Sequence, residues 1–415
     1  MRIVYYVLGW PPDRFQNGVV TAVSALAPAL RRAGHSAQVL AYCGEPDAHE
    51  PDVSFVDAAA REPREFAPLR ALRDRLSPHR HAFDLPAQKI ARRLNEAAGL
   101  KTADILEIEE SFGWSAQIAR ATSIPVVTRL HGPWFLTGAA GRNDRFSSHE
   151  EERVRREGEA IRGALAVTAP SRFVLDAVRA RYDCAIEGAA IIPNAARPVD
   201  GDRGWRLGRA DPNEILFVGR FDRVKGADIV LYAFAKLAAK RPSIKLTFAG
   251  PNAAPMEIAG RSHDCKEFIA SIMPHDAAKR VNLLGPVPQT ELLALRERAF
   301  LTVVGSRIEM FPNVLLEALA SGSPTVATRV GGAPEIARDG EEALFAPGED
   351  IDGLAAAMET FLDEPHLAAR LGAAGRKRVE ADFAPSAIAN TCIDYYANVI
   401  DRMRAAKGAR ARQRG

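Results

Sequence analysis

Short apolar runs alternate with helical patterns along most of this chain. In the first half, a buried strand is predicted at residues 3–8 and a helix at 19–33, after which residues 34–42 turn into the next strand. Further strands are predicted at residues 105–108, 126–130, 164–168 and 189–192. Such alternation is typical of a parallel sheet with helices on both faces, because parallel neighbours need crossover connections. The first half therefore predicts a Rossmann-like domain.

A second series of the same kind begins at residues 214–219. The helices and strands predicted after it are 227–239, 245–249, 281–284, 290–298, 299–306 and 324–328. Residues 196–212 contain Arg, Pro, Gly and Asp without a periodic pattern, as a linker does. Because 415 residues exceed one ordinary core, we expect two doubly wound α/β domains. Their ligands would bind in a cleft that faces the carboxyl ends of the strands.

The composition excludes some classes of protein. With 47% hydrophobic and 26% charged residues, the chain is typical of a soluble globular protein. Its formal charge is +3, but residues 402–415 hold six Arg or Lys and no acid, so the remainder carries −3. A nearly neutral body argues against a nucleic-acid binder. The cysteines form no CxxC pair and are predicted to be reduced thiols in the cytosol: Cys43, Cys184, Cys265 and Cys392.

Membrane segments are not predicted. The first apolar run is too short for a secretory signal, and no run approaches the ~20 residues of a span, so a cytoplasmic protein is expected. Residues 61–93 hold nine Arg or Lys against four acids. With the basic tail at 404–415 they leave open a contact with anionic lipid at the inner face of the membrane, although a solvated surface helix is the simpler interpretation. The apolar positions with helical spacing there are Phe66, Leu69, Leu72 and Leu76.

Two carboxylates, Glu309 and Glu317, stand eight positions apart, and a helix is predicted to begin between them. Pro312 suits the first turn of that helix, and the amides near Val314 and Leu315 have no partner within it. Amides of this kind bind anions. Because helical side chains tilt toward the N-terminus, Glu317 is expected to point back toward ribose hydroxyls. The segment predicts a clamp for a nucleotide-sugar diphosphate; the alternative is an amphipathic helix with solvated glutamates.

Two cations follow the strand predicted at 214–219. Arg220 is at its carboxyl end, and Lys225 is at the start of the next helix. Cleavage of a bond between sugar and phosphate leaves negative charge on the departing oxygen, which preorganised cations stabilise. The alternative is a pair of solvated surface charges. No paired aspartates are placed to bind a metal, so we expect no metal and no cofactor, with the nucleoside-diphosphate sugar as co-substrate.

The spacing of Glu309 and Glu317 between two predicted strands resembles the paired-glutamate motif of retaining glycosyltransferases of the family 4 type (glycosyltransferases group 1). The run Val-Gly-Gly-Ala-Pro-Glu-Ile at 330–336 also resembles that family. The resemblance implies the GT-B fold, in which two Rossmann-like domains face a cleft. The implied parts are an acceptor-side domain at 1–195, a linker at 196–212, a nucleotide-sugar domain at 213–385, a helix at 386–403 that crosses back to the first domain, and a tail at 404–415.

The resemblance also implies roles for individual residues. The catalytic residues would be Arg220 and Lys225 at the diphosphate, with Glu309 and His131 at the transferred sugar. The donor-binding residues would be Gly18, Gly219, Gly250, Pro286, Val287, Met310, Phe311, Pro312, Asn313, Val314, Leu315 and Glu317. Ordinary structural roles are the alternative for the histidine and the glycine turns. Two positions depart from the family: Asn17-Gly18 replaces a glycine pair, and Met310 replaces a small residue.

The acceptor side is less defined. Glu109 and Glu110 end a predicted strand and are a candidate lining for a polyhydroxylated acceptor, with a solvated acidic loop as the alternative. The resemblance implies transfer of a hexosyl unit from a nucleoside-diphosphate sugar to a sugar or glycolipid hydroxyl, in the synthesis of a polysaccharide or glycoconjugate. Two other functions fit the same residues: a GT-B nucleotide-sugar epimerase, and a catalytically silent nucleotide-sugar-binding subunit of a transferase complex.

Overall fold

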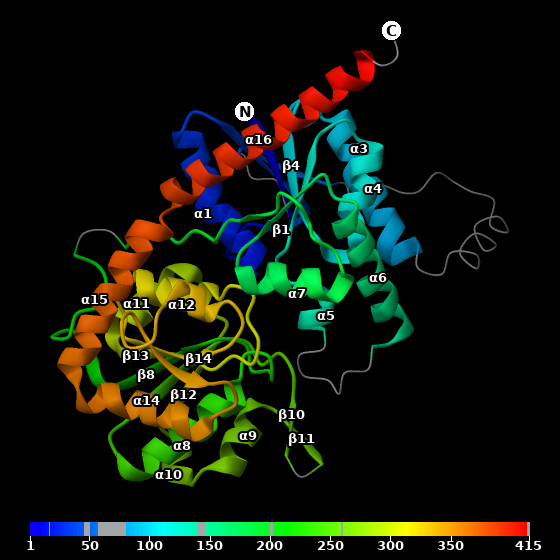
Figure 1. The fold of residues 1–415 in the computed structure, drawn as a ribbon. Helices are drawn as coiled ribbons and strands as arrows, with labels where there is room; N and C mark the ends of the chain where they lie inside the picture. Colours follow the sequence, from blue (N-terminus) through cyan, green and yellow to red (C-terminus); the bar gives the residue numbers. More distant parts are fainter. Residues whose placement is uncertain are drawn as a thin grey trace. The chain divides into compact units, whose positions relative to one another are not determined.

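The chain forms two compact units in a computed structural model (Figure 1). The first comprises Met1–Ala195 with Pro385–Gly415, and the second Ala196–Ala384. The structure describes residues 1–15, 17–44, 50–56, 80–138, 146–199, 202–258 and 260–412, with the backbone alone at residues 80 and 406–412. The helical spacing of Phe66, Leu69, Leu72 and Leu76 falls outside the described residues.

The first unit is built on a seven-stranded sheet in the order β3-β2-β1-β4-β5-β6-β7. Every neighbouring pair is parallel, as the alternation of strands and helices predicted. The strand that the sequence did not predict, β3, spans three residues and is too short for a recognisable apolar run. The strands are β1 (Arg2–Trp10), β2 (Ser36–Gly44), β3 (Val53–Phe55), β4 (Ile105–Glu109), β5 (Val126–Arg129), β6 (Ala166–Ala169) and β7 (Ala190–Ile191).

Alternate residues of β1 face two separate cores, because successive side chains of a strand point to opposite faces. Ile3 and Tyr5 pack in a cluster with α1 and α16, whereas Val4 and Tyr6 pack with α3 and α4. Helices therefore cover both faces of the sheet. The helices of this unit are α1 (Gly18–Arg32), η1 (Arg80–Asp84), α3 (Leu85–Glu96), η2 (Ser111–Gly113), α4 (Trp114–Ala121), α5 (Trp134–Thr137), α6 (Ser148–Arg162), α7 (Arg172–Tyr182) and α16 (Pro385–Arg412).

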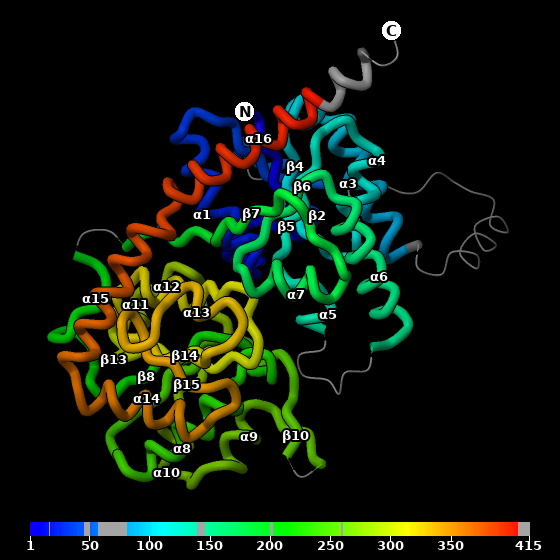
Figure 2. Tube along the Cα trace, viewed as in Figure 1, coloured from blue at the N-terminus to red at the C-terminus, as the bar shows by residue number. Residues whose placement is uncertain are grey.

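The last helix, α16, completes the first core. It lies against α1 (Figure 2), and its residues Cys392 and Tyr396 are buried in the shared core. The hydroxyl of Tyr396 donates to Oε2 of the buried Glu107 at 2.7 Å and lies 3.2 Å from the hydroxyl of Tyr5. The prediction that the helix ends at 403 is wrong, since the backbone stays helical to Arg412. The Ala and Arg residues of that stretch are strong helix formers.

The second unit contains a six-stranded parallel sheet in the order β12-β9-β8-β13-β14-β15 and a separate antiparallel pair, β10-β11. Its strands are β8 (Asp211–Val218), β9 (Lys245–Ala249), β10 (Met256–Ile258), β11 (Arg261–His263), β12 (Val281–Gly285), β13 (Ala299–Val304), β14 (Thr325–Arg329) and β15 (Leu344–Pro347). Its helices are α8 (Ala227–Lys240), α9 (Cys265–Ile272), α10 (His275–Ala278), α11 (Gln289–Arg298), α12 (Asn313–Ala320), α13 (Ala333–Ile336), α14 (Ile351–Asp363) and α15 (Pro365–Asp382).

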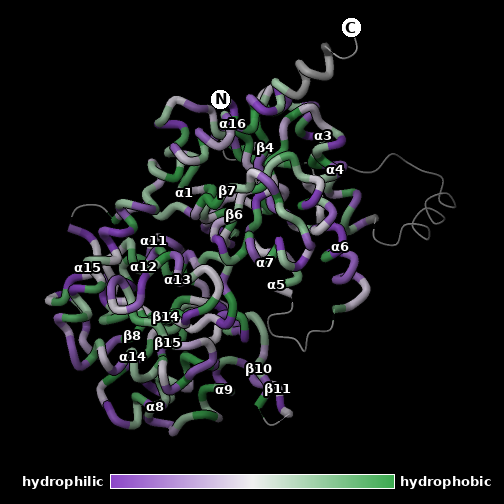
Figure 3. Tube along the Cα trace, viewed as in Figure 1, coloured by the Kyte–Doolittle hydropathy of each residue, from purple (hydrophilic) through white to green (hydrophobic). Residues whose placement is uncertain are grey.

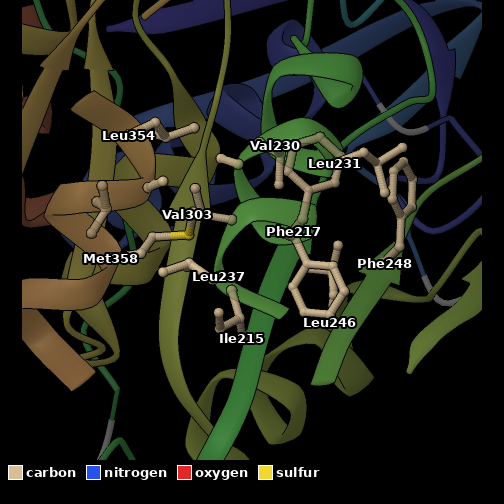
Figure 4. Close-up of a cluster of buried hydrophobic side chains, with 14 of the residues drawn as sticks. Ile215, Phe217, Val230, Leu231, Leu237, Leu246, Phe248, Val303, Leu354 and Met358 are labelled. Carbon is tan, nitrogen blue, oxygen red and sulfur yellow. The ribbon is translucent and has the colours of Figure 1, made fainter. Parts of the chain in front are cut away.

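The main core of the second unit lies between its sheet and helices α8 and α14 (Figure 4). The rings of Phe217 of β8 and Phe248 of β9 are tilted by 59° with centroids 4.7 Å apart, and Leu237 and Met358 approach from the two helices. All four side chains are nearly inaccessible to solvent. Burial on this scale contributes roughly 1.5–3 kcal/mol for each large apolar side chain. The core therefore fixes the positions of the strand ends from which the functional loops leave.

The segment predicted as a linker, residues 196–212, belongs to the second unit, which begins at Ala196. Trp205 is buried in the same core, its backbone amide donates to Ser321 O at 2.7 Å, and its indole N–H donates to Ala299 O at 3.0 Å. β8 also begins at Asp211, three residues earlier than predicted. A single buried tryptophan thus anchors a segment whose composition alone resembles a linker.

Hydropathy differs between the sheets and the outer helices. Hydrophobic residues lie along the strands, whereas α6 is mostly hydrophilic (Figure 3). Among the described residues, no helix is both long and apolar enough to cross a membrane.

Removing the hydroxyl of Tyr396 should destabilise the first unit. Tyr396→Phe takes a hydrogen bond from a buried carboxylate, a loss of about 2 kcal/mol. Urea unfolding measured by fluorescence in a Trp205→Phe background checks this, because Trp10, Trp114 and Trp134 all belong to the first unit. Tyr42→Phe is the control, since that hydroxyl has no hydrogen bond to a described residue. Equal midpoints for the two variants would contradict the role of Tyr396.

Candidate functional site

An ion pair joins the loops that follow β8 and β13. Lys225 Nζ lies 2.7 Å from Glu309 Oε1, and Ser306 Oγ donates to the same oxygen at 2.7 Å. Both charged side chains are mostly buried, with exposed fractions of 24% and 11%. β8 and β13 are neighbours in the sheet, so their carboxyl ends bring together two residues 84 positions apart. The structure thus places two of the predicted catalytic residues in direct contact.

Two glycines allow the backbone to approach this pair closely. Gly226, next to Lys225, has φ of +62°, and a Cβ there would lie 1.7 Å from Gly305 O. Gly331 has φ of +54°, and its Cβ would lie 1.8 Å from Glu309 O. Only glycine adopts these angles without strain and leaves the required space. The loops after β8, β13 and β14 are therefore locked against one another around Glu309.

Arg220 is the second cation of the site, and its side chain is half exposed. Its Nε donates to Asp222 Oδ2 at 2.6 Å, while Asp222 Oδ1 accepts from the backbone amide of Lys225 at 2.7 Å. The buried Asp222 thus holds both cations of the loop in place. Sequence reasoning did not identify this aspartate, although its position between the two cations was a usable signal.

The helix predicted between the two glutamates is α12. It begins at Asn313, so Pro312 precedes the first turn and does not lie within it as predicted. The first bond of the helix runs from Leu316 N to Pro312 O, which leaves the amides of Val314 and Leu315 outside the intrahelical ladder. The side chains of Phe311 and Leu315 are buried in a core cluster. These two residues can offer a ligand only their backbone, and Met310 is almost as buried.

Glu317 contacts helix α11. Its Oε2 accepts from Arg296 Nη2 at 2.7 Å, and its Oε1 accepts from Gln289 Nε2 at 2.8 Å. The side chain of Arg296 is buried, with only 3% exposed, so the pair keeps Glu317 oriented against α11. Sequence reasoning missed both partners, because nothing local connects them to Glu317.

The two glycine turns end neighbouring strands. Gly250 N donates to Gly285 O at 2.8 Å, and Gly219 N donates to Ala249 O at 3.0 Å. The loops after β8, β9 and β12 therefore lie side by side at one edge of the sheet. Val287, two residues after this turn and next to Pro286, packs in a small core with Leu292.

In the first unit, His131 follows β5. Its Nε2 accepts a hydrogen bond from Arg129 Nε at 3.1 Å, and burial together with this guanidinium lowers the pKa of His131 well below its usual range. Gly18 opens α1, one residue before the predicted start of that helix, and the side chain of Asn17 caps the helix by accepting from Val20 N at 2.8 Å.

The prediction that Glu110 lines the acceptor site is wrong, and so is its solvated alternative. Its side chain is fully buried, and its two carboxylate oxygens accept from the backbone amides of His131 and Gly132, each at 2.8 Å. Burial and repulsion by Glu157 and Glu109 raise the pKa of Glu110 to about 8. Burial raises the pKa of Glu109 to about 7. Glu110 therefore positions the histidine loop.

Glu157 of α6 is a further buried carboxylate that sequence reasoning missed. It accepts from the backbone amides of Phe112 and Trp134 and from Arg153 Nε at 2.7 Å. The guanidinium of Arg153 lies 4.0 Å from the centroids of both aromatic rings. This cluster fixes the loops after β4 and β5.

Stability should fall as pH rises from 6.5 to 8. Glu109 and Glu110 have folded pKa values above the usual 4.5, so the folded chain holds protons that the unfolded chain releases. His131 acts in the opposite sense, but only below its ordinary pKa of 6.5. Urea unfolding in the Trp205→Phe background checks the direction. Glu109→Gln should reduce the slope, and stability that is flat or rises over this range would contradict these pKa shifts.

Two family models match this chain. Residues 205–378 match the glycosyl transferases group 1 model, and residues 16–198 match the glycosyltransferase family 4 model. Together they cover most of both units.

Named proteins and solved structures are also similar to this chain. Glycogen synthase of Mycobacterium tuberculosis is 26% identical over 411 residues, which cover 95% of this chain and 94% of that one. D-inositol 3-phosphate glycosyltransferase of Acidothermus cellulolyticus is 36% identical over 182 residues, 42% of this chain and 39% of its own. The fold is similar to that of sucrose-phosphate synthase from Thermosynechococcus elongatus, with a TM-score of 0.73, 21% identity, and coverage of 97% and 100%. Anabaena HepE in complex with UDP and glucose gives a TM-score of 0.68 at 17% identity, with coverage of 96% and 100%.

These matches confirm the resemblance to glycosyltransferases of group 1 and the fold class predicted from the sequence. The chain belongs to the group 1 glycosyltransferases and has the GT-B fold.

Proposed function

We propose that this glycosyltransferase moves a hexosyl unit from a nucleoside-diphosphate sugar to a sugar or lipid-linked sugar hydroxyl, with retention and without a metal. The observation that carries the proposal is the contact between Lys225 and Glu309 at the carboxyl ends of β8 and β13. It joins a cation suited to a phosphate with a carboxylate suited to sugar hydroxyls. Arg220 lies on the same loop as Lys225, and α12 begins four residues after Glu309.

The charges near this pair suit a diphosphate. Arg220 and Lys225 supply two positive charges, and the first amides of α12 supply donors with a favourable helix dipole. These groups are fixed by Asp222 and by the glycine turns before any ligand binds. Preorganised donors stabilise the charge that develops on a departing phosphate without reorganisation. The set can neutralise a diphosphate by itself, which supports the proposal of a metal-independent, cofactor-free reaction.

The donor class gains support from proteins of the same fold. Structures of Anabaena HepE hold UDP with glucose, and TarM was crystallised with UDP. A role in polysaccharide or glycoconjugate synthesis follows the glycogen synthase relative.

The reaction we propose is a displacement on the face of the leaving group. The bond from the anomeric carbon to the phosphate oxygen breaks with its electron pair on the phosphate, and the acceptor oxygen bonds to the same carbon. The acceptor proton passes to the departing phosphate, so no protein base is required. Arg220 and Lys225 hold the charge on the phosphate, Glu309 binds sugar hydroxyls, and Glu317 binds the ribose. Contact of the basic segments at 61–93 and 404–415 with anionic lipid would bring the enzyme to a lipid-linked acceptor.

Lys225→Ala should abolish transfer. The substitution removes a cation from the departing phosphate, and donors of this kind are worth a factor of roughly 10²–10³ in kcat. Turnover of nucleotide sugars is measured by product analysis with candidate acceptors. Lys236→Ala, an exposed lysine of α8 with the same charge change, should leave turnover intact. Full activity of a partner enzyme with the Lys225 variant would favour a silent subunit, and an acceptor-independent change of the nucleotide sugar would favour an epimerase.

Glu317→Ala should weaken nucleotide binding by roughly tenfold or more, the size of a hydrogen bond to a charged group. Calorimetric titration with UDP, GDP and ADP measures this and identifies the base. If the alanine variant unfolds, Glu317→Gln replaces it in the titration, because glutamine keeps the shape of the side chain. Glu291→Ala, an exposed glutamate of α11, is the matched control. If none of the three nucleotides binds, the donor site is assigned wrongly.

A further inference from the structure

The side chain of Arg129 connects three segments at the end of β5. It is buried, and Nη2 donates to Ile192 O at 2.8 Å and to Asn194 Oδ1 at 2.9 Å. Its Nε donates to His131 Nε2 at 3.1 Å. One guanidinium therefore ties the histidine loop to the segment that follows β7.

The hydrogen bond to His131 determines where the ring carries its proton. A guanidinium nitrogen can only donate, so the ring nitrogen that it contacts must be an unprotonated acceptor. The proton of a neutral ring is then on Nδ1, and a doubly protonated ring is excluded while the bond persists. The tautomer of a histidine is set by the hydrogen bond that its other nitrogen makes.

We propose that Arg129 is a positioning residue that holds His131 as a neutral ring protonated on Nδ1. His131 then binds the transferred sugar by donating one hydrogen bond from Nδ1 to a sugar oxygen, and it does not act as a base. The part of this inference that concerns the sugar rests on the proposed function. The part that concerns the ring rests on the hydrogen bond alone.

The backbone of His131 is held independently. The carboxylate of Glu110 accepts from the amides of His131 and Gly132, so the loop cannot rotate. Arg129 then fixes the ring, and Glu110 fixes the chain that carries it. Because the Nδ1–H of His131 is held at one fixed position, it distinguishes sugars by where their accepting oxygen lies. The low pKa of His131 agrees with a ring that stays neutral.

Nitrogen-15 NMR tests the ring directly and needs no substrate. Protein with labelled histidine, recorded at pH 7, should show for His131 a protonated Nδ1 and an unprotonated Nε2. The signal is assigned by its loss in His131→Asn among the nine histidines. In Arg129→Met the preference should be lost, while Arg120→Met, an exposed arginine of α4, should leave it unchanged. A proton on Nε2 in the unsubstituted protein would overturn the proposal, whatever the variants do.

Kinetics test the sugar contact. The amide nitrogen of Asn lies near the position of Nδ1 and that of Gln near Nε2, so His131→Asn should keep about tenfold more kcat/KM than His131→Gln. Arg129→Met should lower kcat/KM by about tenfold. If the methionine variant folds poorly, Arg129→Lys is measured instead and should keep part of the kcat/KM that the methionine variant loses. Equal losses for the Asn and Gln variants, with the expected tautomer, would overturn the sugar contact. Absence of any transferase activity in the unsubstituted protein would instead contradict the proposed function.

Discussion

The ion pair between Lys225 and Glu309 spans two neighbouring strand ends, and the loops of the second unit are arranged around it. Removing one partner of a largely buried pair leaves a charge without compensation, which costs several kcal/mol. The close backbone contacts at Gly226 and Gly331 keep the two loops at the distance that the pair requires. In the function proposed above, a phosphate bound to Lys225 would compete with Glu309 for the same ammonium group, while Ser306 would keep its bond to the carboxylate. Donor binding and carboxylate release would then be linked at one atom.

In the first unit, buried carboxylates hold the loops and the last helix in place. Glu110 holds two backbone amides after β5, Glu157 holds amides after β4 and β5, and Glu107 holds the hydroxyl of Tyr396. Each acidic side chain satisfies backbone or hydroxyl donors that burial would otherwise leave unpaired. An acidic stretch that looks like a solvated loop in sequence is thus an internal scaffold.

Most strands of the two parallel sheets could be predicted because their signal is local, whereas the short β3 and β15 were missed. The run at 245–249 is β9, and the alternation around it determined the parallel fold. Side-chain partners could not be predicted in this way. The pairing of Glu317 with Arg296 bridges 21 positions, and that of Arg129 with Asn194 bridges 65, so each depends on how helices and strands pack. Trp205 shows the same limit, because the composition around it predicts a linker, whereas its indole ring is buried.

The return of α16 to the first unit has a consequence for synthesis of the chain. The second unit is one continuous segment, whereas the first consists of residues 1–195 and a helix that follows the whole second unit in the chain. During translation the second unit can fold as soon as residue 384 has left the ribosome. The carboxylate of Glu107 and the apolar face of α1 lack these contacts until Tyr396 and its neighbours have been synthesised. A nascent chain therefore carries an uncovered face of the first core while the whole second unit is synthesised, and α16 covers that face afterwards.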